Sequence, residues 1–117
     1  MTQKFENLEV WKKAKDLAIE IYKITDKYPQ KEQFAITSQT TRAVVSISCN
    51  IAEGSSRSSK KDFAHFLDIS IGSAFELENL IIIASELGYI LEEKQKEILS
   101  DISTIEKMIN GLKRSLS

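Results

Sequence analysis

Apolar positions recur every three or four residues along most of the chain, which is the spacing of an amphipathic α-helix. In the first segment with this spacing, the apolar residues form one stripe and most charged residues fall on the opposite side. The stripe comprises Trp11, Ala14, Ala18, Ile21, Thr25 and Tyr28. Proline pushes the residue before it out of the α region. Pro29 therefore ends a predicted first helix over about residues 7–28.

A second apolar row is embedded in a run of small and hydroxyl-bearing residues. The row comprises Ile36, Ala43, Ile47 and Ile51. Several neighbours are β-branched, which favours a strand, but the polar residues do not alternate as they would in one. We therefore predict a helix over about residues 32–53, which Gly54 ends in the left-handed conformation.

A third helix is predicted over about residues 59–87. Its stripe comprises Phe63, Leu67, Ser70, Ala74, Leu77, Ile81 and Ala84. Either Ser58 or Ser59 can cap its first turn, and Ser59 with Asp62 at the third position makes a shortened capping box. Gly88 can close the helix.

The second half of this helix is apolar nearly all round. Phe75, Ile82 and Ile83 point away from the main stripe. A helix of this kind needs burial on more than one side. The pattern therefore indicates a contact beyond the core of one chain.

A fourth helix is predicted over about residues 92–115, starting in the acidic turn Glu92-Glu93. Its apolar row is the most regular in the chain: Ile98, Ile102, Ile105, Ile109, Leu112 and Leu116. Four helices joined by connections of about five residues are typical of up-down-up-down topology. We predict one all-α domain over residues 1–117, an antiparallel four-helix bundle.

The composition agrees with a helical protein and excludes several classes. Four glycines and one proline are too few for the turns of an all-β protein. A net charge of −1 excludes a general polycation. Cys49 is the only cysteine, and we interpret it as a small packed core residue. With no signal peptide and no apolar run long enough for a bilayer, the sequence predicts a cytoplasmic protein without a membrane role.

The residue inventory offers little catalytic chemistry. His65 is the only histidine, so a Cys–His dyad or a histidine-containing zinc site is not expected. We interpret His65 as a solvated or interface residue. Glycine-rich phosphate loops and the Glu-x-x-His pairs of di-iron bundles are absent from the sequence. We therefore expect no enzyme, metal, cofactor or small-molecule substrate.

Several polar residues nevertheless lie on or beside the apolar stripes: Arg42, Asn50, Glu53, Glu76 and Glu78. A charge that is wholly or partly buried must be paired, because its desolvation otherwise costs several kcal/mol. The favoured interpretation is a salt bridge from Arg42 to a glutamate, which fixes helix register or a subunit contact. Partner binding and a metal or catalytic carboxylate are the alternatives.

The connection between the second and third helices is basic. Residues 54–61 hold Arg57, Lys60 and Lys61 and no acid. Free backbone N–H groups at the start of a helix attract phosphate. The sequence thus predicts a phosphate-attracting corner, and a solvated polar loop remains the alternative.

Five stretches together carry a family resemblance: Phe5-Glu6-Asn7-Leu8-Glu9-Val10-Trp11, Ile21-Tyr22, the run from Thr37-Ser38-Gln39 through Arg42, Asn50-Ile51-Ala52-Glu53-Gly54 and Gly72-Ser73-Ala74-Phe75-Glu76-Leu77-Glu78. The chain resembles the four-helix-bundle proteins encoded in intervening sequences of bacterial 23S ribosomal RNA genes. It departs from them at Ser48-Cys49, where the family usually has proline and alanine. It departs again at Thr41-Arg42, where two adjacent arginines are frequent.

The resemblance implies a ring-forming homo-oligomer, typically a pentamer. A similar bundle is the accessory variability determinant of diversity-generating retroelements, where a basic ring binds nucleic acid and a reverse transcriptase. Where the family often has two adjacent arginines, this chain has Thr41-Arg42 and therefore one positive charge fewer. This difference weakens the expectation of a basic inner surface in the ring.

We therefore expect a non-enzymatic homo-oligomeric bundle that associates with RNA or a nucleoprotein. The candidates for nucleic-acid contact are Arg57, Lys60, Lys61 and Arg42. The candidates for subunit contact or a structural network are Asn50, Glu53, Glu76, Glu78, Phe75, Ile82 and Ile83. The alternative is a protein-binding scaffold with no nucleic-acid role. For an enzyme, only Glu53, Glu76 and Glu78 are available as acid–base groups.

Overall fold

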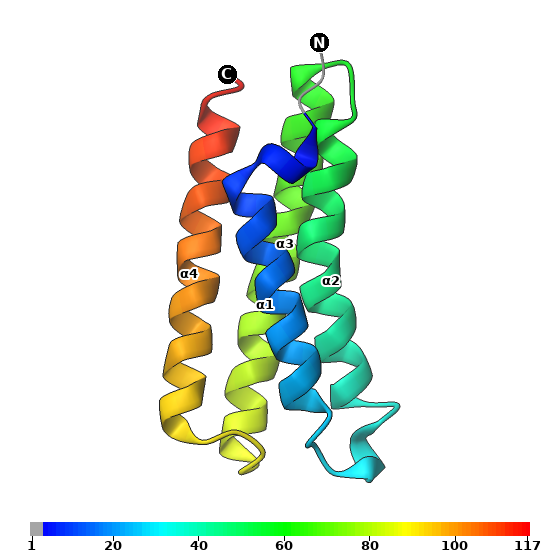
Figure 1. The fold of residues 1–117 in the computed structure, drawn as a ribbon, viewed down its shortest axis with the longest axis vertical. Helices are drawn as coiled ribbons and strands as arrows, with labels where there is room; N and C mark the ends of the chain where they lie inside the picture. The colour runs from blue at the N-terminus through cyan, green and yellow to red at the C-terminus, as the bar shows by residue number, and fades with distance from the viewer. Residues whose placement is uncertain (1–3) are drawn as a thin grey trace.

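The computed structural model describes residues 4–117, and within this range the chain is entirely helical apart from its connections (Figure 1). The long helices are α1 (Glu9–Thr25), α2 (Ile36–Ser55), α3 (Lys60–Glu86) and α4 (Glu92–Arg114). Short 3-10 turns, η1 (Phe5–Asn7) and η2 (Gln30–Glu32), precede α1 and α2. The predicted all-α class is confirmed.

Successive helices run in opposite directions and form a rod of 46 × 24 × 20 Å (Figure 1). Each helix packs on its neighbours in sequence, and α1 also packs on α4, so the bundle closes around one core. The seam between α2 and α3 is the most extensive. The α2–α3 connection lies at the same end of the rod as both ends of the described chain (Figure 1).

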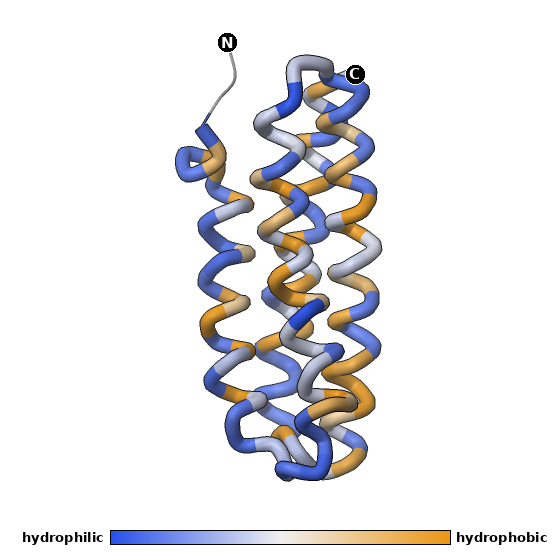
Figure 2. Tube along the Cα trace, turned by 90° about the vertical axis from the view of Figure 1, so that its right-hand side faces the viewer, coloured by the Kyte–Doolittle hydropathy of each residue, from blue (hydrophilic) through white to orange (hydrophobic). Residues whose placement is uncertain are grey.

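The predicted apolar stripes become the core. On α4, Ile98, Ile102, Ile105 and Ile109 are completely buried, and they belong to one core cluster with the buried apolar residues of the other three helices. Figure 2 shows the corresponding alternation of hydrophobic and hydrophilic residues along each helix. Burial of each such side chain contributes about 1.5–3 kcal/mol to the free energy of folding. Because each helix buries one side, its apolar residues recur with the helical period, and this period alone identifies the helices.

The second helix starts later than predicted. It begins at Ile36 rather than near residue 32, because Pro29 is followed by the turn η2 and then by Ala35 at φ −121° and ψ −110°. No side chain caps this helix. Because α1 also ends earlier than predicted, at Thr25 rather than near residue 28, the connection from α1 to α2 spans residues 26–35, where the predicted bounds left only residues 29–31.

The prediction for Gly54 is wrong. Gly54 lies within α2, and among residues 4–117 only Gly88 has a positive φ, at +83°. A Cβ atom at Gly54 would lie 2.8 Å from Cβ of Phe66 and 2.9 Å from Cδ1 of Phe63. Glycine is present here because α3 approaches closely.

The predicted ends of α3 are confirmed. The Ser59 hydroxyl accepts a hydrogen bond from the backbone N–H of Asp62 at 3.0 Å, which caps the first turn. Gly88 follows the last turn in the left-handed conformation that an L side chain rarely adopts.

Candidate interaction surfaces

The basic corner at the start of α3 is less positive than the sequence predicts. The guanidinium of Arg57 pairs with Glu53 at 2.7 Å between Nη2 and Oε1, and it lies over the Phe66 ring at 4.8 Å from the centroid. Lys60 and Lys61 are exposed. Three cations and two carboxylates within residues 53–62 leave one net positive charge.

The predicted salt bridge from Arg42 to a glutamate is wrong within one chain. Arg42 is exposed on α2, and no ion pair formed between residues 4–117 includes it. Glu53 pairs with Arg57 instead, and Glu76 is exposed on α3. Exposure removes the reason for a pair, because a hydrated charge has no desolvation cost to offset.

Asn50 belongs to a polar network in the seam between α2 and α3. Its amide donates to the backbone carbonyl of Ser46 at 2.8 Å and to the Ser46 hydroxyl at 3.0 Å. That hydroxyl lies 2.7 Å from the hydroxyl of Ser73 on α3. The Ser70 hydroxyl donates to the carbonyl of Ile47 at 2.8 Å. Small polar residues thus bring the two backbones together with their hydrogen bonds satisfied.

Glu78 on α3 lies beside Glu106 on α4, a neighbour that the sequence pattern did not indicate. Burial, together with the charge and the hydrogen bond of the adjacent Glu78 carboxylate, raises the pKa of the Glu106 carboxyl to about 7. Oε2 of Glu106 is buried and has no hydrogen-bond donor among residues 4–117 when both groups are ionised. A protonated Glu106 carboxyl would donate a hydrogen bond to the Glu78 carboxylate. The pair therefore carries fewer than two negative charges near neutral pH.

Apolar side chains project from the outer side of α3. Phe75 is 57% exposed and Ile83 and Ile69 are each 41% exposed, while Ile82 is half-buried. Cys49 on the outer side of α2 is also exposed, so its interpretation as a packed core residue is wrong. The core positions nearest it in sequence are Ile47 and Ile51, and a residue midway between them points outward.

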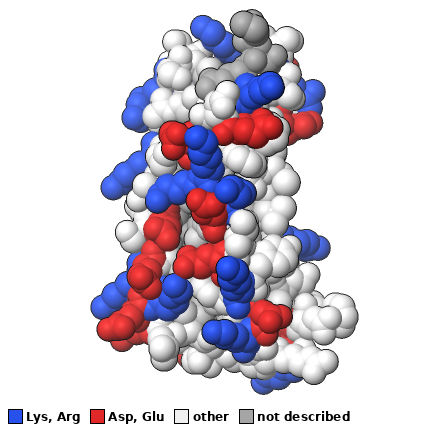
Figure 3. Space-filling model, in the orientation of Figure 1, with Lys and Arg blue, Asp and Glu red and all other residues white. Residues whose placement is uncertain are grey.

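Charge is distributed unevenly over the surface. Figure 3 shows lysine and arginine interleaved with aspartate and glutamate on the face that α1 and α4 present. Lys94 bridges to Glu20 at 2.9 Å across these two helices. By contrast, α2 carries only Arg42 and Glu53 as charged residues over twenty positions. The outer surface of α2 is therefore largely uncharged.

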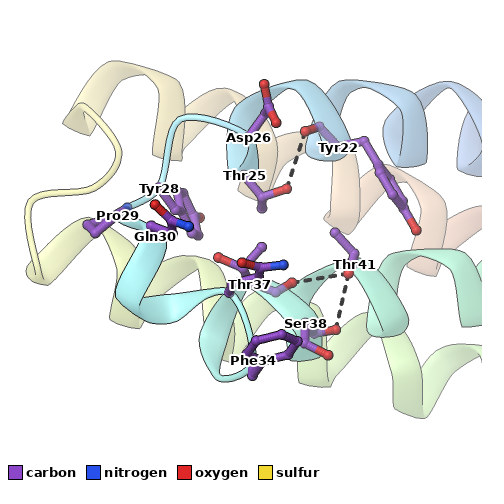
Figure 4. Close-up of a pocket in the computed structure, with 11 residues that line it drawn as sticks. Tyr22, Thr25, Asp26, Tyr28, Pro29, Gln30, Phe34, Thr37, Ser38 and Thr41 are labelled. Carbon is purple, nitrogen blue, oxygen red and sulfur yellow. Dashed lines mark hydrogen bonds between the residues drawn. The ribbon is translucent and has the colours of Figure 1, made fainter.

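A hollow of about 690 Å³ lies between the last turn of α1 and the first turns of α2 (Figure 4). Tyr22 from α1 and Phe34 from the segment before α2 line it together with hydroxyl-bearing residues of α2. Tyr28 also lines the hollow and is buried, and this burial raises the pKa of its phenol to about 12. The Tyr28 hydroxyl has no hydrogen-bond partner among the residues that the structure describes.

The sequence interpretation missed this hollow. The available signal was that Tyr22 and Phe34 are aromatic residues lying off every predicted apolar stripe. Both are exposed, at 53% and 90% respectively. Phe34 also falls within the predicted helix over residues 32–53, which in fact begins only at Ile36.

The described part of the chain presents no group of three histidine, cysteine, aspartate or glutamate side chains that could hold a metal ion. Within residues 4–117, none of the helices has the length and apolar character needed to cross a bilayer. His65 is exposed on α3.

Four antiparallel helices closed around one aliphatic core define an up-down four-helix bundle. Residues 6–111 match the 23S rRNA-intervening sequence protein family, and the chain therefore belongs to that family. A solved structure from Bacteroides thetaiotaomicron, a protein of unknown function from the S23 ribosomal protein family, superposes with a TM-score of 0.83 at 25% identity, covering 90% of this chain and 95% of that one. No curated protein is significantly similar.

Proposed function

We propose that the chain is a non-enzymatic subunit of a homo-oligomer that associates with RNA or a nucleoprotein. The observation that supports assembly is the outer side of α3, where Phe75, Ile69 and Ile83 are 57%, 41% and 41% exposed. Large apolar residues gathered on one element mark an interaction site, whereas scattered ones do not. A second copy that covers this row would remove it from water.

The backbone beside this row also allows close approach. Gly72 lies on the same outer side of α3, and a Cβ atom placed on it would meet nothing within 4 Å. A neighbouring helix can therefore approach the α3 backbone there more closely than at a position with a side chain. A pentamer is the stoichiometry that the family resemblance implies.

Light scattering tests the assembly. The wild-type mass is expected near about five times the 13.2 kDa of one chain, and the double variant Phe75→Glu/Ile83→Glu is expected near one chain. Circular dichroism should show unchanged helix content, because both side chains lie outside the core. Ile19→Glu on α1, where the residue is 50% exposed, serves as the matched control and should retain the wild-type mass. A wild-type mass of one chain at micromolar concentration overturns the assembly.

The association with RNA is supported by Lys60 and Lys61, which are exposed in the first turn of α3. The helix dipole and the free N–H groups of that turn add to their attraction for phosphate. One net positive charge per corner is a weak attraction alone. An oligomer repeats the corner in every subunit, so the attraction for a polyanion grows with the number of copies.

Salt dependence tests the RNA part. Lys60→Ala/Lys61→Ala should weaken binding of single-stranded RNA and lower the slope of log affinity against log salt by about 1.4. Lys96→Ala/Lys107→Ala removes the same charge from α4 and should leave the slope unchanged. Equal slopes for the two double variants would contradict the corner as the site of phosphate contact.

The alternative is a protein-binding scaffold with no nucleic-acid role. The pairing of Arg57 with Glu53, which reduces the charge of the corner, favours it. A partner that remains bound after nuclease treatment, together with affinity that does not change with salt, would support the scaffold.

A further inference from the structure

The hollow between α1 and α2 is remote from the basic corner. The α1–α2 connection that borders it lies at the opposite end of the rod from the α2–α3 connection (Figure 1). Its volume of about 690 Å³ falls within the range of roughly 300–1,000 Å³ found for small-ligand sites. The two surfaces can therefore be tested separately.

Two aromatic rings lie at the mouth of the hollow. Phe34 is 90% exposed and Tyr22 is 53% exposed, and they lie on either side of the hydroxyls of α2 in Figure 4. A phenylalanine with this exposure has ring faces free to contact a ligand. A flat aromatic group stacked on it would remove apolar surface of both partners from water.

The remaining lining is polar and nearly uncharged. Among the lining residues only Pro29 and Phe34 lack a polar side-chain group, and only Asp26 is a charged side chain. Thr37 and Ser38 lie in the first turn of α2, where no side chain caps the backbone N–H groups. The hollow thus offers both donors and acceptors, and no lysine or arginine for a phosphate.

We propose that this hollow takes an unpaired nucleobase of RNA, stacked on Phe34 with its polar edge toward the amides and hydroxyls of the lining. A base is planar, neutral and bears donors and acceptors on one edge, which matches each property of the lining. Single-stranded RNA is read in this way by aromatic platforms. That the ligand is RNA rests on the proposed function. The match between a planar, neutral, polar-edged group and the lining of the hollow does not.

A segment of a second copy is the competing occupant. The buried centre of a protein interface is rich in apolar contacts and poor in unpaired polar groups. The Thr25 and Thr41 hydroxyls already donate to backbone carbonyls of their own helices. The remaining polar side chains of the lining, among them Gln33, Thr37 and Ser38, would need hydrogen-bond partners that a packed helix face does not supply. The nucleobase is therefore the better match.

Binding of a short single-stranded RNA, with and without abasic sites, tests the proposal. Phe34→Ala should weaken binding of intact RNA on the order of 5- to 100-fold, because stacking is lost. Phe34→Tyr should retain binding, and abasic RNA should bind the wild type and Phe34→Ala equally. Leu91→Ala is the matched control, since Leu91 is 81% exposed on another connection, and it should bind as the wild type does.

Further measurements separate the possible failures. If Lys60→Ala/Lys61→Ala weakens RNA binding and Phe34→Ala does not, the base site is wrong and the proposed function stands. If no RNA binds, guanosine is titrated at millimolar concentration, and the aromatic resonances of Tyr22, which also lines the hollow, are observed by NMR in the wild type and in Phe34→Ala. A shift absent from Phe34→Ala supports the hollow while the proposed function fails, and the absence of any shift overturns both. A changed light-scattering mass for Phe34→Ala assigns the hollow to a subunit contact and overturns the proposal.

Discussion

Gly54 lies inside a helix with no room for a side chain. Gly54→Ala gains helix propensity of about 1 kcal/mol, but its methyl would lie 2.8 Å from Cβ of Phe66. Displacing a neighbour in a well-packed seam costs about 1–3 kcal/mol. We therefore expect Gly54→Ala to lower the free energy of unfolding, measured by urea denaturation.

Gly111→Ala is the matched control for this substitution. A Cβ atom there would lie 3.8 Å from Nη2 of Arg114, which is ordinary contact. The same change should therefore raise the stability by up to about 1 kcal/mol. Equal effects of the two substitutions would contradict the close approach at Gly54.

Glu106 predicts a pH dependence. Its pKa is about 7 in the folded protein against an ordinary 4.5. Its contribution to stability is therefore fully present below about pH 4.5 and is lost as the pH rises through 7. After allowance for solvent screening, we expect a loss on the order of 1 kcal/mol between pH 5 and pH 8.

Glu106→Gln should remove this loss, because an uncharged amide replaces the carboxylate beside Glu78. The variant should be more stable than the wild type at pH 8 and similar to it at pH 5, measured by thermal unfolding. The exposed Glu93→Gln should change stability equally at both pH values. A wild-type stability that does not change over this interval would contradict the raised pKa.

At the scale of the helix, the α3 start depends on one hydroxyl. Ser59→Ala removes the acceptor for the Asp62 N–H and should destabilise the protein by about 1 kcal/mol. Ser58→Ala is the matched control, since its side chain makes no hydrogen bond within residues 4–117. Equal urea midpoints for the two variants would show that the cap contributes nothing.

The helices themselves could be predicted because each buries a stripe with a 3.6-residue period. The start of α2 could not, because no capping residue marks Ile36 and the chain bends through η2 first. Gly54 was misassigned for a related reason. A glycine near the end of a helix can serve a left-handed turn or a close approach, and only the position of Phe66 on another helix decides between them.

The candidate site residues were predictable only in part. Lys60, Lys61, Phe75 and Ile83 are exposed, and a helical period alone places such residues outside the core. The pairing of Arg57 with Glu53, and of Glu78 with Glu106, depends on rotamers and on helix packing that a sequence does not specify.

For the whole molecule, packing is uneven around the bundle. The α2–α3 seam is the most extensive and the α1–α4 seam the least. We expect native-state hydrogen exchange to show the highest opening free energies for amides of α2 and α3, with α1 and α4 opening at lower free energy. A single opening free energy for all four helices would contradict this expectation.

Both ends of the described chain share one end of the rod with the α2–α3 connection (Figure 1). A purification tag or fluorescent protein fused to either end therefore sits nearer to Lys60 and Lys61 than to the hollow bordered by Phe34. Such fusions can crowd the basic corner while they leave the distant hollow accessible. Binding assays on the corner call for tag-free protein, and surface immobilisation through either end should present the hollow to solution.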